Sequence, residues 1–422
     1  MLKFWSKNLA SVTSMMLISV LLLGIWDVKP VNAEVQPLDK DDNTYRIVSL
    51  GDSLTVGYEP GVNKNMKPYG FVDRLLEQGL IHGRTEVVNL GINGLTTEGL
   101  HRYVQAVVDE KAISPRDMQS GLKDPRAGKI GAKAAQAKTL LANADVITVT
   151  IGGNDMLGLL NTSYTASTQG FSALVQQVIK TYTDNVTSVV HNLHRINPDA
   201  LIVLADQYQP LPKIADKKIY SKMLEAAERF TGLVDEMAES FNKDGIDVKV
   251  AHVAKEFVGS EMVMTHILKK DIHPNQHGYE AMARVFSEVI WGEYTKLEAS
   301  DPSEPMTIFV NGKELKTPYK PIMVNNKNFA AVQDIVNAVG AKSKWSNETS
   351  SLTITFEDRT VVITIGAETI KINGEIVPID TPAFLHKVGK EHKTYAPLEA
   401  VAFGLGLDVQ YSAKLRTVFI HP

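Results

Sequence analysis

The chain has 422 residues, no cysteine and a formal net charge of −4 at pH 7. This length predicts two domains, because typical domains run to about 100 to 200 residues. The lack of cysteine excludes disulfides and thiolate metal sites, and an acidic balance without a basic stripe argues against a nucleic-acid-binding protein.

The N-terminus has the pattern of an export signal. Lys3 and Lys7 precede an apolar run over residues 15–26, and residues 31–33, Val-Asn-Ala, are typical of a signal-peptidase site. The run is shorter than the roughly 20 residues of a membrane-spanning helix, which favours cleavage over an uncleaved anchor. We therefore predict that residues 1–33 are a signal peptide of bacterial type. The mature protein, with a net charge of −6 after the loss of three lysines and one aspartate, is expected to be extracellular or at the cell surface and to have no transmembrane segment.

Residues 34–298 are predicted to form the first domain. Short apolar runs alternate there with longer amphipathic ones, which is typical of a parallel sheet with crossover helices. A helical pattern over residues 171–193 ends before Pro198, and a last helix follows Gly278. The predicted strands are residues 45–50, 86–90, 145–151, 200–205 and 247–253.

Four polar motifs follow the predicted strands. Ser53 stands in Gly-Asp-Ser-Leu, residues 51–54, after the first strand. Residues 89–96 read Asn-x-Gly-x-x-Gly-x-Thr after the second strand, residues 152–155 read Gly-Gly-Asn-Asp after the third, and His273 follows the last. The carboxyl ends of parallel strands form the ligand crevice, so we expect these motifs to converge. A serine nucleophile needs a base and oxyanion donors, so the set predicts a serine esterase, although each motif alone would be read as a turn.

These motifs, in this order, resemble the GDSL, or SGNH, hydrolase family. The resemblance implies a flavodoxin-like three-layer α/β/α domain with a five-stranded parallel sheet. It also implies that Ser53 is the nucleophile and His273 the base. The implied oxyanion donors are the backbone N–H groups of Ser53 and Gly94 and the side-chain amide of Asn154. No cofactor and no metal are expected, and the sequence lacks a zinc-type His-x-x-x-His with a glutamate base.

The acid partner of the histidine departs from the family pattern. The family usually has its aspartate three residues before the histidine, where this chain has Lys270. Asp271, two residues before His273, is the only acid in that segment. Either Asp271 reaches the imidazole, or a backbone carbonyl holds it and the site works as a Ser-His dyad. We favour Asp271, because a base is normally oriented by a third group.

Apolar residues beside the motifs predict the substrate class. Met156 and Leu157 follow the third motif, and Leu54 and Leu95 lie in the first two. They favour a lipid or another acyl ester, that is, an esterase or lipase of lipid metabolism. A cell-wall polysaccharide O-acetylesterase with the same site is the alternative, and a non-catalytic surface-binding protein is a third reading. The insertion over residues 114–137 either covers the crevice or is a tolerated loop.

Residues 299–306 are predicted to be a linker, because periodicity is lost and proline, serine and acids accumulate. Residues 307–422 contain an imperfect repeat around two Asn-Gly turns, which predicts a small α+β module. The repeated stretches are residues 308–312 with 370–374 and residues 332–354 with 397–420.

This C-terminal part resembles the copper amine oxidase N-terminal domain. Copper amine oxidase chemistry would need a histidine cluster and an Asn-Tyr-Asp/Glu cofactor precursor. The chain has no Asn-Tyr pair, and His386, His392 and His421 are isolated in the sequence. We therefore expect this part to serve in attachment to the cell envelope or in partner binding, without copper.

Overall fold

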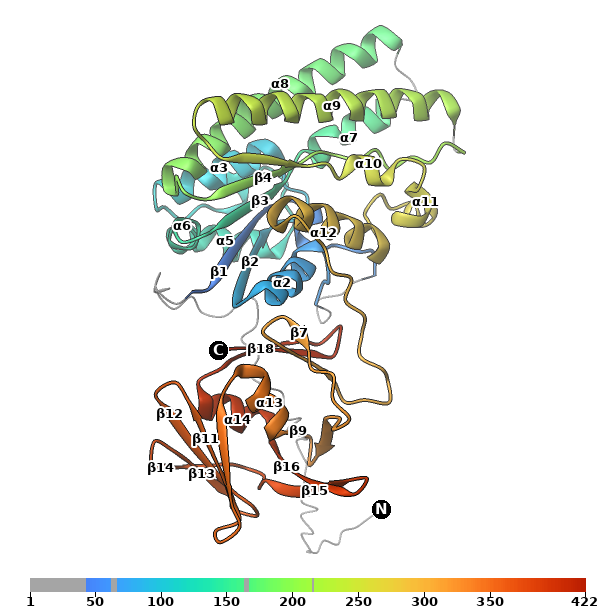
Figure 1. Ribbon diagram of the computed structural model, residues 1–422. Helices are drawn as coiled ribbons and strands as arrows, with labels where there is room; N and C mark the ends of the chain where they lie inside the picture. Colours follow the sequence, from blue (N-terminus) through green and yellow to red (C-terminus); the bar gives the residue numbers. More distant parts are fainter. Residues whose placement is uncertain (1–42, 62–66, 163–166, 215) are drawn as a thin grey trace, which may run out of the picture.

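The computed structural model describes residues 43–61, 67–162, 167–214 and 216–422 (Figure 1). The predicted signal peptide lies outside the described residues. Hydrophobic cores form separately between Ile47 and Phe286 and between Met306 and Ile420. The exact domain boundaries stay predictions. Within the described ranges, no helix combines the length and the apolar composition needed to cross a membrane.

The first part is built on a five-stranded parallel sheet with the order β2-β1-β3-β4-β5. Its strands are β1 (Tyr45–Gly51), β2 (Thr85–Gly91), β3 (Val146–Thr150), β4 (Leu201–Ala205) and β5 (Val248–Ala251). All five predicted strands are confirmed. Helices cover both faces of such a sheet, so its strands are continuous apolar runs that can be recognised in the sequence. The strand order reverses between β1 and β3, which opens a crevice at the carboxyl ends of these strands.

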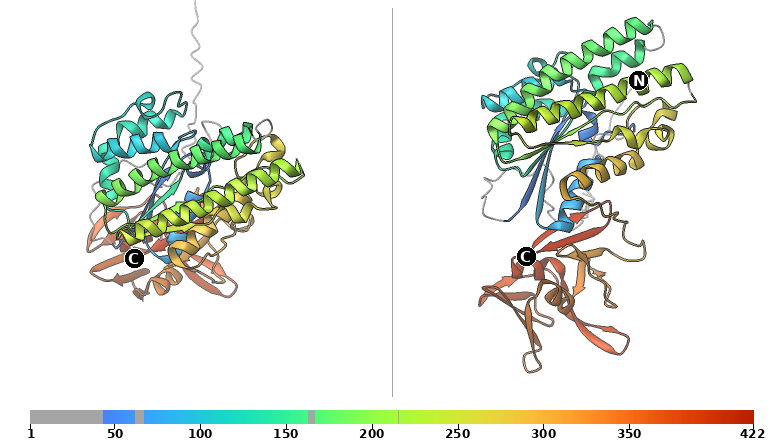
Figure 2. Two further views of the ribbon diagram at one scale, coloured as in Figure 1. Left: turned by 90° about the horizontal axis from the view of Figure 1, so that it is seen from above. Right: turned by 45° about the horizontal axis from the view of Figure 1, so that its top comes forward.

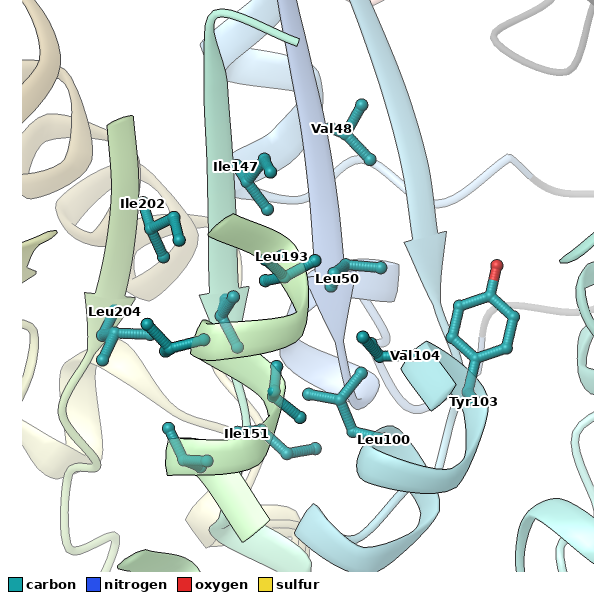
Figure 3. Close-up of a cluster of buried hydrophobic side chains, with 14 of the residues drawn as sticks. Val48, Leu50, Leu100, Tyr103, Val104, Ile147, Ile151, Leu193, Ile202 and Leu204 are labelled. Carbon is teal, nitrogen blue, oxygen red and sulfur yellow. The ribbon is translucent and has the colours of Figure 1, made fainter. Parts of the chain in front are cut away.

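Helices cover both faces of the sheet, which confirms the three-layer α/β/α architecture. α2 (Phe71–His82) and α12 (Gln276–Trp291) pack on one face. The other face is covered by α3 (Thr97–Val108), α6 (Ala134–Ala142), α8 (Thr168–Ile196) and α9 (Lys217–Lys243). Figure 3 shows this second layer, where Leu50 and Ile147 of the sheet lie against Leu100 of α3 and Leu193 of α8.

Shorter helices complete the first part. They are α1 (Ser53–Val56), α4 (Pro115–Met118), α5 (Pro125–Ala132), α7 (Gly153–Thr162), α10 (Ala254–Phe257), α11 (Glu261–Met264) and the 3-10 helix η1 (Ile267–Lys269). Asn275 explains where α12 begins, since its Oδ1 accepts the N–H groups of His277 and Gly278. Several of these short helices lie at the carboxyl edge of the sheet, so they shape the crevice.

The C-terminal part consists mostly of β-strands, together with two short helices, as the α+β prediction requires. Its two helices are α13 (Val332–Val339) and α14 (Leu398–Leu405). Its strands are β6 (Thr307–Val310), β7 (Lys313–Glu314), β8 (Ile322–Val324), β9 (Lys327–Ala331), β10 (Lys342–Ser346), β11 (Ser351–Phe356), β12 (Arg359–Thr364), β13 (Thr369–Ile372), β14 (Glu375–Pro378), β15 (Phe384–Val388), β16 (Glu391–Pro397), β17 (Asp408–Ser412) and β18 (Thr417–His421).

The internal repeat has a structural counterpart. Each helix of this part follows a strand and precedes a two-stranded hairpin: β9, α13 and β10-β11 in one half, and β16, α14 and β17-β18 in the other. The two Asn-Gly turns also match. Asn311 and Gly312 have φ values of 49° and 72°, and Asn373 and Gly374 have values of 50° and 91°. Positive φ at both central residues is the requirement of a tight hairpin turn.

The two parts contact each other through α2 and the end of the chain (Figures 1 and 2). Ser412 Oγ donates to Glu77 Oε1 at 2.6 Å, and Gln410 Nε2 donates to the carbonyl of Thr85 at 2.8 Å. Gly312 lies so close to α2 that an added Cβ would be 1.8 Å from the carbonyl oxygen of Ile81. The contact is therefore closely fitted and includes a buried carboxyl group.

Candidate active site

The turn after β1 presents Ser53 at the carboxyl edge of the sheet. Gly51 has φ 146°, and an added Cβ there would lie 2.1 Å from the carbonyl oxygen of Thr150, so only glycine fits. Asp52 caps the single-turn helix α1, and its Oδ1 accepts the N–H of Leu54 at 3.0 Å. Ser53 is buried except for 8% of its surface, and its hydroxyl faces His273.

Ser53, His273 and Asp271 form one hydrogen-bonded series. His273 Nε2 lies 2.8 Å from Ser53 Oγ, and His273 Nδ1 lies 2.7 Å from Asp271 Oδ1. Lys270 ends η1 in the left-handed region with φ 63°, and this reversal turns the following aspartate back toward the ring. The arrangement is that of a nucleophile, a base and an orienting acid. It is the first of the two geometries that the sequence left open.

Backbone contacts join the two ends of the loop that precedes His273. The N–H of His266 donates to the carbonyl of His273 at 2.9 Å, and Thr265 pairs with Pro274 in an isolated antiparallel bridge. The His266 ring lies 2.8 Å from Glu59 Oε2, and Glu59 follows the nucleophile helix in the chain. The segment with the base is thus tied to the segment with the nucleophile.

Two tyrosines surround the histidine. Tyr208 donates its hydroxyl to the carbonyl of Ile272 at 2.8 Å, and burial raises the pKa of Tyr208 well above its ordinary value, so it stays a donor. The ring of Tyr58 meets the ring of His273 edge-on at a centroid distance of 4.5 Å. These contacts fix the position and the tilt of the imidazole.

Gly94 follows β2, and Asn154 lies at the start of α7 after β3. Gly94 is exposed with φ 79°, and nothing lies within 4 Å of the place where its Cβ would stand, so its backbone is open to a ligand. Asn154 Nδ2 donates to the carbonyl of Leu95 at 2.8 Å. The amide nitrogen carries a second hydrogen, for which the described part of the chain offers no acceptor in hydrogen-bond range.

The insertion over residues 114–137 supports the Gly94 loop instead of covering the crevice. Gln119 Nε2 donates to the carbonyl of Gly94 at 2.9 Å, and Gln119 Oε1 accepts the N–H of Thr96 at 2.8 Å. Asp124 Oδ2 accepts the N–H of Asn93 at 2.6 Å. No residue of the insertion lines the cavity beside Ser53. Its role in the site is therefore one of positioning.

One buried and one half-buried carboxyl group, Asp52 and Asp155, lie next to the site residues Ser53 and Asn154 in the chain. Burial raises the pKa of Asp52 to about 7, the nearby Asp155 adds to the rise, and the N–H of Leu54 opposes it. Burial also raises the pKa of Asp155, which accepts the hydroxyl of Thr97 at 2.6 Å and its N–H at 3.0 Å. Asp155 thereby ties the third motif to the start of α3.

A cavity of about 340 Å³ opens beside the serine. The residues that line it are Asp52, Ser53, Leu54, Gly153, Asn154, Met156, Leu157, Leu159, Gln207, Tyr208, Gln209, Pro210, Met223, Ala226, Ala227, Lys270, Asp271, Ile272 and His273. The polar lining includes Ser53, His273, Gln207 and Gln209, and helices α7 and α9 supply most of the apolar lining. Such a shape suits a ligand with one reactive polar end and an apolar remainder.

Most of the residues predicted to contact substrate line this cavity, namely Leu54, Met156 and Leu157. Leu95 does not, so its expected role is wrong. Its side chain is fully buried in the core cluster beside α3, because the turn at Gly94 directs the next side chain inward.

Several cavity residues carried no sequence motif. Gln207 and Tyr208 follow β4, and the rule that ligands bind at the carboxyl ends of parallel strands could have drawn attention to that loop. Met223 and Ala226 lie on α9, where they read as ordinary residues of an amphipathic helix. No signal in the sequence distinguishes them from core positions.

Comparisons with known proteins identify a family for each of the two parts of the chain. The model of the GDSL-like lipase/acylhydrolase family matches residues 47–286, and that of the copper amine oxidase N-terminal domain matches residues 309–420. No curated protein matches the chain.

Similar solved structures include hydrolases with different substrates. The lipase Lip_vut3 from a goat rumen metagenome is 20% identical, with 57% of this chain and 95% of that chain covered and a TM-score of 0.41. Phospholipase A1 from Streptomyces albidoflavus is 14% identical (59% and 99% covered, TM-score 0.38). An acetyl-xylooligosaccharide esterase from Geobacillus is 16% identical (60% and 96% covered, TM-score 0.36).

The family match spans more than half of the chain and includes the segments of Ser53, Gly94, Asn154 and His273. The chain belongs to the GDSL-like lipase/acylhydrolase family, and it is a serine ester hydrolase.

Proposed function

We propose that the protein hydrolyses acyl esters through a covalent acyl-enzyme on Ser53. The observation that carries this proposal is the hydrogen-bonded series Ser53, His273 and Asp271 at the mouth of an apolar cavity. Ser53 Oγ attacks the ester carbonyl while His273 Nε2 takes its proton, and the histidine then gives this proton to the leaving alcohol. Water, activated by the same nitrogen, releases the acid and restores the serine.

The oxyanion of each tetrahedral intermediate is proposed to be held by three donors. They are the backbone N–H groups of Ser53 and Gly94 and the second amide hydrogen of Asn154. The open backbone of Gly94 and the anchoring of Asn154 on Leu95 support this assignment, because preorganised donors stabilise developing charge without reorganisation.

The substrate is proposed to be an ester with an apolar acyl chain. The cavity beside Ser53 has apolar surface from Leu54, Met156, Leu159 and Met223, which suits an acyl chain. A polysaccharide acetyl ester would place only a methyl group there. The apolar wall therefore favours a lipid-type acyl ester.

Chain-length profiling tests this proposal. Purified protein is assayed on p-nitrophenyl esters from acetate to laurate and, in parallel, on acetylated glycans, without added metal. We expect kcat/KM to rise from acetate to medium chains and to fall to background in Ser53→Ala. Preference for acetylated glycans would identify the O-acetylesterase instead, and full activity of Ser53→Ala would end the serine mechanism.

Export and envelope attachment form a second part of the proposal. The charged and apolar pattern of residues 1–33 supports secretion, and a C-terminal part with its own core supports a separate binding role. A chain ending at Ala299 should remain folded, keep its kcat on soluble esters and lose association with the cell envelope. A folded but inactive truncated chain would show that the C-terminal part helps to build the site.

A further inference from the structure

Some exposed apolar side chains of the first part stand on, or next to, segments that line the cavity. Of the described side chains between residues 43 and 298, the large apolar ones that are exposed all lie between residues 157 and 268. They are Leu157, Ile214, Val258, Met262, Val263 and Leu268. Single exposed apolar residues are normal on a protein surface, but a gathering at one functional opening indicates an interaction.

Three of these side chains stand on segments that also line the cavity. Leu157 lines it directly and is 39% exposed. Ile214 is 82% exposed and follows the lining residue Pro210 by four positions. Leu268 is 73% exposed and precedes the lining residue Lys270 by two positions. Leu157, Ile214 and Leu268 thus belong to three segments that contribute residues to the cavity.

The buried neighbours of these residues show that the three segments meet. Leu159, Leu211 and Ile219 belong to one hydrophobic cluster, and Ile267 packs against it. Leu159 is on the helix of Leu157, Leu211 and Ile219 flank Ile214 in the chain, and Ile267 precedes Leu268. Figure 1 shows α7, the first turns of α9 and α11 at the same end of the domain. The exposed side chains therefore surround one cluster.

Positive charge accompanies the apolar side chains. Five exposed lysines flank Ile214 and Leu268 in the chain, namely Lys213, Lys217, Lys218, Lys269 and Lys270. The two aspartates of these segments are engaged, since Asp216 accepts backbone N–H groups at the start of α9 and Asp271 holds His273. The whole chain has a net charge of −4, whereas the two segments around Ile214 and Leu268 carry more lysines than aspartates.

We propose that this rim, defined as Ile214, Leu268 and the five lysines, docks on an anionic lipid surface with the cavity mouth facing the lipid. Apolar side chains inserted among the acyl chains and lysines at the headgroups are the two attractions that such a surface offers. The inference rests on the proposed acyl-ester activity, because docking there would place an acyl chain directly before the cavity that opens at Ser53.

Vesicle flotation of the full-length Ser53→Ala protein tests docking without hydrolysis. We expect binding to vesicles with phosphatidylglycerol in phosphatidylcholine and little binding to pure phosphatidylcholine. The double substitution Ile214→Ser and Leu268→Ser should weaken binding by at least about tenfold, because two apolar side chains no longer leave water. The matched control, Ile376→Ser with Leu385→Ser, alters exposed apolar residues of the C-terminal part and should bind as before.

The lysines give an independent measurement. The double substitution Lys213→Glu and Lys269→Glu should weaken binding to the anionic vesicles. Raising the salt concentration from about 0.1 M to 1 M should weaken binding of the unsubstituted protein, because the Debye length falls from about 10 Å to 3 Å. The proposal is overturned if Ser53→Ala protein ignores anionic vesicles. It is also overturned if the control pair reduces binding as much as the rim pair.

Hydrolysis of a soluble ester separates this inference from the proposed function. With Ser53 intact, the rim pair should keep its kcat/KM on dissolved p-nitrophenyl butyrate and lose rate on phosphatidylglycerol vesicles. Inactivity of the unsubstituted protein on both substrates would overturn the proposed function, whereas flotation would still report on docking. Equal rates of rim pair and unsubstituted protein on vesicles would overturn the docking alone.

Discussion

Asp271 Oδ1 accepts two hydrogen bonds from His273, one from its backbone N–H at 2.9 Å and one from its ring Nδ1 at 2.7 Å. The first is a local turn between an aspartate and the residue two positions on. The second orients the base. The left-handed Lys270 before this turn lets one carboxylate serve both purposes, so a spacing of two residues brings the acid to the imidazole.

Removal of this carboxylate should leave the loop in place but weaken the base. We expect Asp271→Asn to lower kcat by about 10⁴, as replacement of the triad acid by its amide does in a serine protease, with a much smaller change in KM. Steady-state kinetics on a soluble ester give the measurement. Lys270→Gly, which keeps the left-handed turn accessible, is the control and should retain most activity. An Asp271→Asn enzyme near the unsubstituted rate would establish a Ser-His dyad.

The donors opposite the serine can be tested through Asn154 and Gln119. Asn154→Ala should cost roughly 10² to 10³ in kcat, because one oxyanion donor is lost. Gln119→Leu should also lower kcat, by a smaller factor, since Gln119 holds the carbonyl of Gly94 from outside the cavity. Gln105→Leu, a half-buried position of α3 whose side chain bonds Asp109 and Asn192, is the comparison for Gln119 and should change kcat little. Unchanged kcat in Gln119→Leu would mean that the Gly94 loop holds its position without the insertion.

Acyl-chain preference should depend on Ala226. This residue lines the cavity from α9, so Ala226→Phe would fill part of the space beside Met223. We expect kcat/KM to fall for octanoate and laurate esters and to stay nearly constant for acetate, which serves as the internal control. Equal losses for all chain lengths would indicate a general distortion, and no loss would place the acyl chain elsewhere.

The contact between the two parts of the chain should weaken as the pH rises. Burial raises the pKa of Glu77 to about 7, while hydrogen bonds from Ser412 and Tyr69 oppose the rise. A carboxyl with a raised pKa in the folded state contributes stability that is fully present below its ordinary pKa of 4.5. This contribution is lost as the pH rises through about 7. At about 1.4 kcal/mol per pKa unit, the loss amounts to roughly 3 kcal/mol at most.

Thermal unfolding at pH 5 and pH 8 gives the measurement for Glu77. The unsubstituted protein should lose more stability between these values than Glu77→Gln does. Asp52, whose pKa is also raised to about 7, is present in both proteins, so its contribution cancels in the difference. Glu98→Gln replaces an exposed carboxylate and should leave the pH dependence unchanged. Parallel pH profiles for the unsubstituted protein and Glu77→Gln would contradict the prediction.

The sequence by itself determined the sheet, its strand positions and the four segments that converge on the site. These features depend on local rules: a strand buried on both faces must be a continuous apolar run, and a turn such as the one at Gly51 needs the one residue without a Cβ. The repeat of the C-terminal part, with its Asn-Gly turns, was readable for the same reason.

Only the tertiary structure brought Asp271 within hydrogen-bond distance of His273, because that geometry depends on the left-handed turn at Lys270, a residue type that seldom adopts it. The tertiary structure also shows that Leu95 is buried in the core and that Tyr208 and Ala226 line the cavity. It further shows that the insertion contacts the Gly94 loop. Such placements depend on contacts between segments far apart in the chain, and the sequence pattern of one segment does not specify which distant segments it will contact.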